Sequence, residues 1–200
     1  MMRAALTAIA FGTLSVAVPA AAQEAESPIA QFARCTVGAD AAGARALLAL
    51  APGSVESKKA AKQLADKKTS CGGAIKRPGE PEIRGAIAER LYLDTYATPP
   101  APLAGAPAPF QGSGDPTQAM YDVTRCAASR DPVAADMLIR ARAGTAEEKA
   151  ALARIVPAVG NCTPQGAKLG FNRDQLHALI AEGLFKVRSA APAAATGGSN

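Results

Sequence analysis

The chain of 200 residues has few of the residues on which catalytic centres and nucleic-acid sites usually depend. It has no tryptophan, one histidine and 4% aromatic residues. It also lacks G-x-G-x-x-G, Walker, H-E-x-x-H and G-x-S-x-G motifs, which bind nucleotides, bind zinc or present a nucleophilic serine. We therefore expect no cofactor, and a binding role is favoured over an enzymatic one.

Long apolar runs are also scarce, and the main one lies at the amino terminus. Arg3 precedes an apolar run from Ala4 to Val18, which Pro19 and three alanines follow. This order is typical of a cleaved signal peptide, and the run is shorter than the roughly 20 residues that span a bilayer. We predict cleavage after Ala22, export to the periplasm or the medium of a bacterium, and no transmembrane segment after cleavage.

The remainder of the chain contains an internal duplication. A shift of 91 positions (125 − 34) superposes the two copies of Arg-Cys-x-x-x-x-Asp without a gap between the cysteines of either half. The matches in this register are Arg34 with Arg125, Cys35 with Cys126, Asp40 with Asp131, Gly53 with Gly144, Glu56 with Glu147 and Cys71 with Cys162. A shift of 93 positions (176 − 83) then aligns IRGAIAERLY with LHALIAEGLF. Repeats of this kind indicate one structural unit present twice.

Each unit is predicted to form four helices, because apolar residues recur at helical spacing and no stretch alternates as a strand does. The predicted helices are Pro28–Val37, Ala41–Ala51, Val55–Lys68 and Pro81–Tyr96, then Pro116–Ser129, Pro132–Arg142, Ala146–Val156 and Arg173–Val187. Asp40, Asp131, Ser54 and Thr145 fit helix N-caps, and Pro157 is expected to stop or kink the seventh helix. The fold class is therefore all-α, with two tandem four-helix units.

The segments around the two units have a different composition. Residues 97–116 are rich in Pro, Ala and Gly, as in an extended linker. Residues 189–200 have no apolar period and predict a disordered tail. The expected organisation is a signal peptide at 1–22, unit 1 at 23–96, the linker, unit 2 at 117–188, and the tail.

The four cysteines admit three pairings, and the duplication favours one of them. If a single ancestral unit folded alone, its two cysteines paired, so we predict Cys35–Cys71 and Cys126–Cys162. Such a bridge stabilises a small unit by roughly 4 kcal/mol in the chain-entropy model. A metal site would need closely spaced thiols with histidine, and a redox pair would favour C-x-x-C; neither pattern is present.

The acidic residues Glu89 and Glu182 occupy the same place in the two IAE sequences. Two carboxylates can act as acid and base on a glycan, so a cell-wall glycan hydrolase is the alternative function. A repeated salt bridge or solvated helix face is the favoured interpretation, with Arg34 and Arg125 as candidate partners. The only histidine, His177, is expected to be a surface helix residue rather than a general base.

Basic residues cluster in the third helix of the first half and have no full counterpart in the second. They are Lys58, Lys59, Lys62, Lys67 and Lys68. With a net charge of +5, this cluster suits an anionic envelope polymer, although a solvated helix surface is the simpler interpretation. No aromatic residues accompany the charges, so nucleic acid is not an expected partner. An envelope protein is the other partner considered.

The combination of signal peptide, FARC…D…ARALLAL…PGS…C and IRGAIAERLY, followed by the same pattern again, resembles uncharacterised exported proteins of alphaproteobacteria. The likeness extends over both halves. It implies export and a helical fold. It transfers no catalytic or binding residue, and the lysine-rich third helix departs from it.

Overall fold

The computed structural model describes residues 26–66, 70–72, 75–76, 78–107, 109–110 and 112–190. The predicted signal peptide, Lys67, Lys68 and the tail after residue 190 lie outside the described residues. Within the described part all regular structure is α-helical. The helices are α1 (Pro28–Ala39), α2 (Ala41–Ala49), α3 (Val55–Leu64), α4 (Glu80–Thr95), α5 (Ala119–Arg130), α6 (Pro132–Arg140), α7 (Ala146–Cys162) and α8 (Arg173–Ala190). The chain is thus an all-α protein of two tandem four-helix units.

The helices begin where the capping pattern predicts. The Asp40 carboxylate accepts the Gly43 amide at 2.8 Å, and the Asp131 carboxylate accepts the Ala134 amide at 2.9 Å. Gly53 and Gly144 both have positive φ, as expected, but each lies in the turn before the next N-cap rather than directly after the preceding helix. These matched turns give the two units the same local plan.

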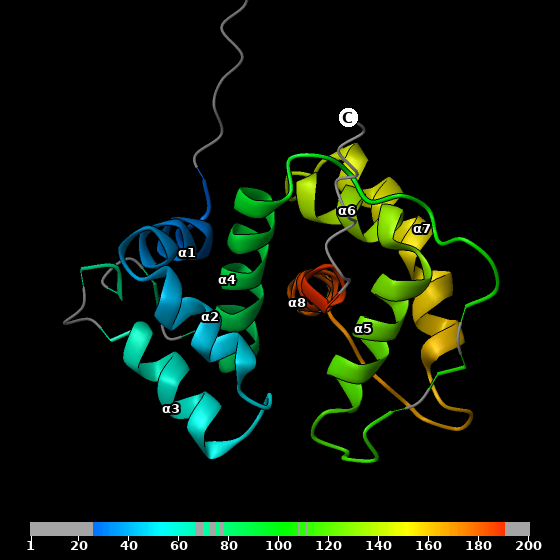
Figure 1. Cartoon of the computed structure of the whole chain (residues 1–200), viewed down its shortest axis with the longest axis horizontal. Coiled ribbons are helices and arrows are strands. Elements are labelled where there is room, and N and C mark those ends of the chain that lie inside the picture. Colours follow the sequence, from blue (N-terminus) through cyan, green and yellow to red (C-terminus); the bar gives the residue numbers. More distant parts are fainter. Residues whose placement is uncertain are drawn as a thin grey trace, which may run out of the picture.

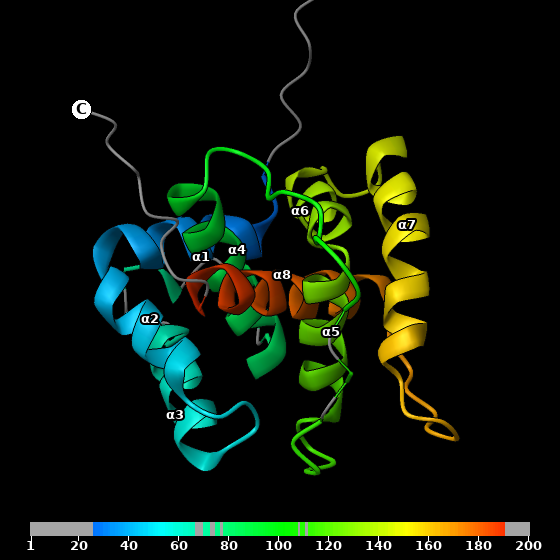
Figure 2. The same cartoon turned by 45° about the vertical axis from the view of Figure 1, so that its right-hand side comes forward.

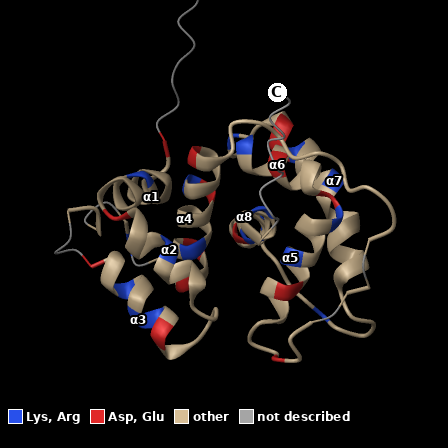
Figure 3. Cartoon of the chain, in the orientation of Figure 1, with Lys and Arg blue, Asp and Glu red and all other residues tan. Residues whose placement is uncertain are grey.

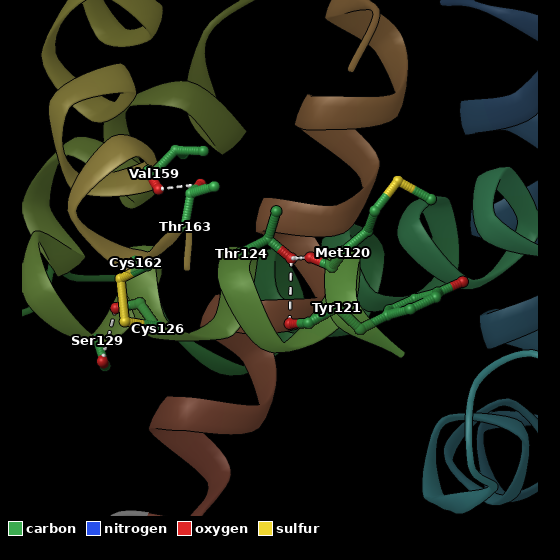
Figure 4. The surroundings of a disulfide bond; sticks show 8 residues. All are labelled: Met120, Tyr121, Thr124, Cys126, Ser129, Val159, Cys162 and Thr163. Carbon is green, nitrogen blue, oxygen red and sulfur yellow. Dashed lines mark hydrogen bonds between the residues drawn. A yellow bond between two sulfur atoms is a disulfide. The ribbon is translucent and has the colours of Figure 1, made fainter. Parts of the chain in front are cut away.

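Each unit carries its own disulfide, as predicted. Cys35 bonds Cys71, and Cys126 bonds Cys162, with Cα–Cα distances of 5.6 and 5.9 Å. Figure 4 shows the second bridge joining α5 to the end of α7, next to hydroxyl groups that bond carbonyl oxygens within their own helices. Both disulfides indicate an oxidising, extracellular compartment.

Two predicted boundaries of the third helices are wrong. Helix α7 continues through Pro157 to Cys162 instead of ending near Val156. Pro157 and Ala153, whose carbonyl loses its amide partner, are both exposed, so water can satisfy that oxygen. In the first half the helix is shorter than expected, because α3 ends at Leu64.

Helix α8 joins the two units. It lies between α4 and α5, crosses both, and packs against each of them (Figures 1 and 2). Where α4 and α8 cross, a Cβ atom built on Gly85 would lie 2.4 Å from the Cβ of Ala178. Only glycine therefore permits this close approach of the two helices.

The linker lies against the second unit. It leaves α4, passes α6 and curves around the outer side of the second unit to the start of α5 (Figures 1 and 2). The Arg188 guanidinium donates to the Thr98 carbonyl at 3.0 Å near its beginning. The Ser113 amide donates to the Asp122 carboxylate at 2.7 Å near its end. The connection between the units is therefore anchored at both ends.

The structure also bears on membrane insertion. In the described part of the chain, no helix combines the length and the apolarity needed to cross a membrane.

Candidate functional site

The most heavily bonded side chain in the junction between the units is Arg84 of α4. It is fully buried, with 0% exposure. Its Nε donates to Glu182 Oε2 at 2.9 Å and its Nη2 to Glu182 Oε1 at 2.5 Å. Glu182 comes from α8 and is 2% exposed. This bidentate pair connects the two units through a buried, hydrogen-bonded ion pair.

The remaining N–H groups of Arg84 bond the carboxyl end of α2. They donate to the carbonyls of Leu47 at 2.8 Å, Leu48 at 3.3 Å and Leu50 at 3.2 Å. Carbonyls in the last turn of a helix have no partner within the helix and carry partial negative charge. Arg84 therefore satisfies the end of α2 while it binds Glu182.

Two other side chains complete the first-half site. Arg84 Nη1 donates to Ser57 Oγ at 2.7 Å, and Ser57 Oγ donates to the Glu80 carboxylate. Glu80 also accepts the amide of Gly53 at 3.0 Å and lies 3.9 Å from Arg84 Nη1. The turn before α3 is thus bonded to α4.

In the second unit, different residues bond the turn before the third helix. The amide of Gly144 donates to Glu148 Oε2 at 2.7 Å, and Glu148 pairs with Arg173 at 3.4 Å. Glu148 occupies the position of Ser57, and Arg173 occupies the position of Glu80. The carboxylate that accepts the glycine amide therefore comes from α4 in unit 1 and from α7 in unit 2.

The residue that matches Arg84 in the second unit is His177. Its Nε2 lies 3.0 Å from Glu89 Oε2, so it too connects α4 with α8. Burial acts to lower the pKa of His177, but the hydrogen bond with Glu89 and the charge of Glu89 outweigh it, with smaller contributions from Glu148 and Asp174. The pKa of His177 is therefore raised above its ordinary value.

The two ion pairs are reciprocal. Arg84 matches His177 and Glu89 matches Glu182 in the repeat, so each unit gives a basic residue and a carboxylate to the other. Gly85 and Ala178, which meet at the helix crossing, are also equivalent positions. Contacts of residue i with j and of the equivalent j with i define an approximate two-fold axis, as in a symmetric dimer.

A second polar cluster lies at the far end of α4. Tyr92 donates its hydroxyl to Asp136 Oδ1 at 2.5 Å, and Arg140 donates to both oxygens of Asp136 at 2.9–3.0 Å. Arg188 bonds the Tyr92 oxygen at 3.0 Å and lies over the Tyr96 ring at 4.0 Å. Burial, followed by the hydrogen bond to Asp136, raises the pKa of Tyr92 to about 12. This cluster joins α4, α6 and α8.

The predicted partners of the repeated glutamates are wrong. Arg34 pairs with Glu26, and Arg125 pairs with Asp122 at 3.1 Å. Glu182 instead binds Arg84 and Lys186, the latter at 2.7 Å. Each glutamate thus bonds a basic residue of the opposite unit, Glu182 with Arg84 and Glu89 with His177, and the second contact is an ion pair when His177 is protonated.

The same geometry bears on glycan hydrolysis. Both oxygens of Glu182 are engaged by Arg84, and Glu89 is paired with His177. A general acid or nucleophile must reach the glycosidic bond, and Glu182 is buried in the junction. These contacts favour a structural role for the two glutamates.

Two pockets lie on the described part of the second unit, one of them beside the junction. One of about 30 Å³ lies beside Tyr121, Glu182 and Lys186, and has room for one or two water molecules. The Tyr121 hydroxyl has no hydrogen-bond partner among the described residues. Burial and then the charge of Glu182 raise its pKa. A larger, mainly apolar pocket of about 350 Å³ lies between Phe110 and α5.

Figure 3 shows basic residues along α3, and helical spacing places the described part of the predicted lysine cluster on one face of this helix. Lys58, Lys59 and Lys62 are exposed, and no described carboxylate forms a salt bridge with any of them. We name these three residues the α3 lysine surface. Lys67 and Lys68 lie outside the described residues.

The importance of Arg84 was missed, although the sequence contains a signal for it. In a helix, Arg84 lies on the same face as Ile87, Ala88 and Leu91, so its side chain points along an apolar stripe. A charge in that position indicates a buried residue with dedicated partners. The partners themselves come from α2 and α8 and could not be found by spacing.

Comparisons with family models, curated proteins and solved structures gave no match.

Proposed function

We propose that the chain is an exported binding module of the bacterial envelope, and that its α3 lysine surface binds a polyanionic envelope polymer. The observation that carries this proposal is the presence on one face of α3 of three exposed lysines that form no salt bridge with a described carboxylate. Export is supported by the two disulfides and by the predicted signal peptide. The resemblance to exported alphaproteobacterial proteins agrees with the same setting.

Comparison of the two units indicates that the α3 lysine surface is not part of the scaffold that they share. The positions of Lys58, Lys59 and Lys62 correspond to Lys149, Ala150 and Ala153 in the second unit. The second unit folds on the same scaffold with one lysine in place of three. The additional charge is therefore not needed for the fold, which leaves it available for binding.

The arrangement suits a flexible polymer that carries regularly spaced phosphates or carboxylates. Lys58, Lys59 and Lys62 lie at spacings of one and three residues and are exposed to solvent on one side of α3. Each lysine near an anionic surface contributes about 1 kcal/mol, and salt screens the attraction over about 10 Å. Binding should therefore weaken steeply as the ionic strength rises.

The test is binding of the full mature chain to lipopolysaccharide, measured by fluorescence anisotropy at several salt concentrations. The triple variant Lys58→Gln, Lys59→Gln, Lys62→Gln should lose roughly tenfold or more in affinity. The matched control removes three exposed cations from the second unit through Arg142→Gln, Lys149→Gln and Lys168→Gln.

The control should bind nearly as tightly as the natural sequence. Equal losses in the two triple variants would show that only net charge matters and would overturn the assignment to α3. Binding that does not change with salt would overturn the electrostatic mechanism itself.

A further inference from the structure

We infer that a second copy of this chain can occupy the α4–α8 interface, giving a homodimer in which the two chains exchange halves. In this dimer α4 of one chain packs on α8 of the other, and α8 of the first chain packs on α4 of the second. The inference is independent of the polymer-binding proposal. It rests on the reciprocity of the junction, on the placement of the disulfides and on the burial of the junction charges.

The first basis is that the described ion pairs between α4 and α8 lie within one reciprocal interface. Arg84 meets Glu182, and Glu89 meets His177, across an approximate two-fold axis near Gly85. The surface that one half presents is thus the complement of the other half. Whether that other half belongs to the same chain makes no difference to these contacts.

The second basis is the covalent connectivity. Each disulfide lies within one half, at a sequence separation of 36 residues. The backbone linker at 97–116 is the one covalent connection between the halves in the described structure. A half can therefore separate from its neighbour while its own bridge stays intact, which is the condition for exchange of a whole half.

The third basis is what separation exposes. Arg84 and Glu182 are almost fully buried and come from different halves. Tyr92 on α4 is likewise buried, at 0% exposure, and its hydroxyl bonds Asp136 and Arg188 of the second half. A separated half would present these groups to water together, so it has a strong tendency to capture a complementary half.

Chain concentration decides between the closed monomer and the exchanged dimer. When the halves separate, the linker loses its anchoring contacts with Arg188 and Asp122 and becomes a flexible tether, which gives an effective concentration of roughly millimolar. The closed monomer therefore dominates in dilute solution. Near that concentration the two forms have similar free energies, and small differences between interface pairs decide which one is populated.

The test uses two variants of the full mature chain with complementary changes at the more accessible pair. One carries Glu89→Lys and the other carries His177→Glu. Each alone places an unfavourable pair in its own junction: a lysine beside the natural His177 in the first variant, and two carboxylates in the second. A mixed exchanged dimer pairs the introduced lysine with the introduced glutamate and keeps one natural Glu89–His177 pair, so both unfavourable pairs are removed.

The two variants are unfolded together in guanidinium with their disulfides intact, refolded at roughly millimolar concentration, and weighed by native mass spectrometry. We expect the ratio of mixed dimers to like dimers to be about five times the statistical value, because one exposed ion pair contributes up to about 1 kcal/mol. The chain that carries both substitutions should remain monomeric in dilute solution, because its own pair is restored. Circular dichroism of each separate variant confirms that it folds.

Two outcomes would overturn the inference. One is a mixture that contains only monomers after refolding. The other is a set of dimers in which like and mixed species occur in the statistical ratio, because such dimers would form through a different surface. A second pair of chains, Arg84→Glu with Glu182→Arg, applies the same test at the buried pair.

Discussion

The two halves of the molecule share a scaffold and differ in the charges that hold it. At the helix crossing, unit 1 contributes Arg84, which is buried and bonded to α2 and α8. At the equivalent position unit 2 contributes His177, which is partly exposed and bonded only to Glu89 among the described residues. One interface therefore contains a permanent cation at one site and a titratable group at its symmetric counterpart.

The turn before the third helix shows the same exchange of partners. Gly53 and Gly144 keep their positive φ, and each donates its amide to a carboxylate. The carboxylate is Glu80 in one unit and Glu148 in the other. Both units thus keep this hydrogen bond, but the carboxylate that accepts it lies on α4 in unit 1 and on α7 in unit 2.

The largest expected effect is the loss of the buried pair in unit 1. Arg84→Met leaves Glu182 without its bidentate partner and removes the guanidinium donor from the carbonyls of Leu47, Leu48 and Leu50. We expect the free energy of unfolding to fall by about 3–5 kcal/mol, measured by urea denaturation. Glu89→Gln at the symmetric pair should cost about 1 kcal/mol or less. Equal losses would show that the two pairs are not energetically distinct.

The next effect concerns the helix crossing. Gly85→Ala forces a methyl group into the space of Ala178, so we expect a loss of about 1–3 kcal/mol in thermal or urea unfolding. Gly38→Ala is the control, because a Cβ at Gly38 meets nothing within 4 Å. The control should gain up to about 1 kcal/mol from helix propensity. A neutral Gly85→Ala would mean that α4 and α8 are not in close contact.

A smaller effect tests the exchanged carboxylates. Glu80→Gln and Glu148→Gln each weaken the acceptor of a turn glycine amide, and each removes a charge next to an arginine. We expect losses of about 1–2 kcal/mol in both units, because hydrogen bonds to charged groups contribute about that much. Urea titrations of the two variants measure this. A loss confined to one unit would show that the two turns are not equivalent.

The smallest effect is the pH dependence of the His177–Glu89 pair. Because the pKa of folded His177 is raised, its pair stabilises the fold below the unfolded value of about 6.5 and loses that contribution as pH rises through the folded value. The natural chain should exceed His177→Gln in unfolding free energy by about 1 kcal/mol or less at pH 5, and by less at pH 9. A difference that grows with pH would have the wrong sign.

Local patterns in the sequence were enough to predict the helical class and the N-caps, and the duplication was enough to predict the two disulfides. Asp40 and Asp131 each precede an apolar helical repeat, and their carboxylates do cap α2 and α6. The cysteine pairing followed from the assumption that one unit folds alone. Local patterns failed at Pro157, where an exposed carbonyl lets α7 continue to its disulfide.

The partners of the glutamates could not be predicted, because they depend on how the two units pack. Arg34 and Arg125 are repeated arginines next to the bridged cysteines, which made them candidate partners, yet the structure pairs them with Glu26 and Asp122. Glu182 pairs with Arg84, which is 98 residues away in the chain. Such a pairing becomes visible only when α4 and α8 are placed side by side.

The most direct test of this junction is a double-mutant cycle at Arg84 and Glu182. The free energy of unfolding is measured for the natural chain, for Arg84→Met, for Glu182→Met and for the chain with both changes. We expect the double variant to lose about 2–3 kcal/mol less than the sum of the single losses, because the second change removes a buried charge that has already lost its bidentate partner and keeps only Lys186. Additive losses would contradict the conclusion that this buried pair joins the two units.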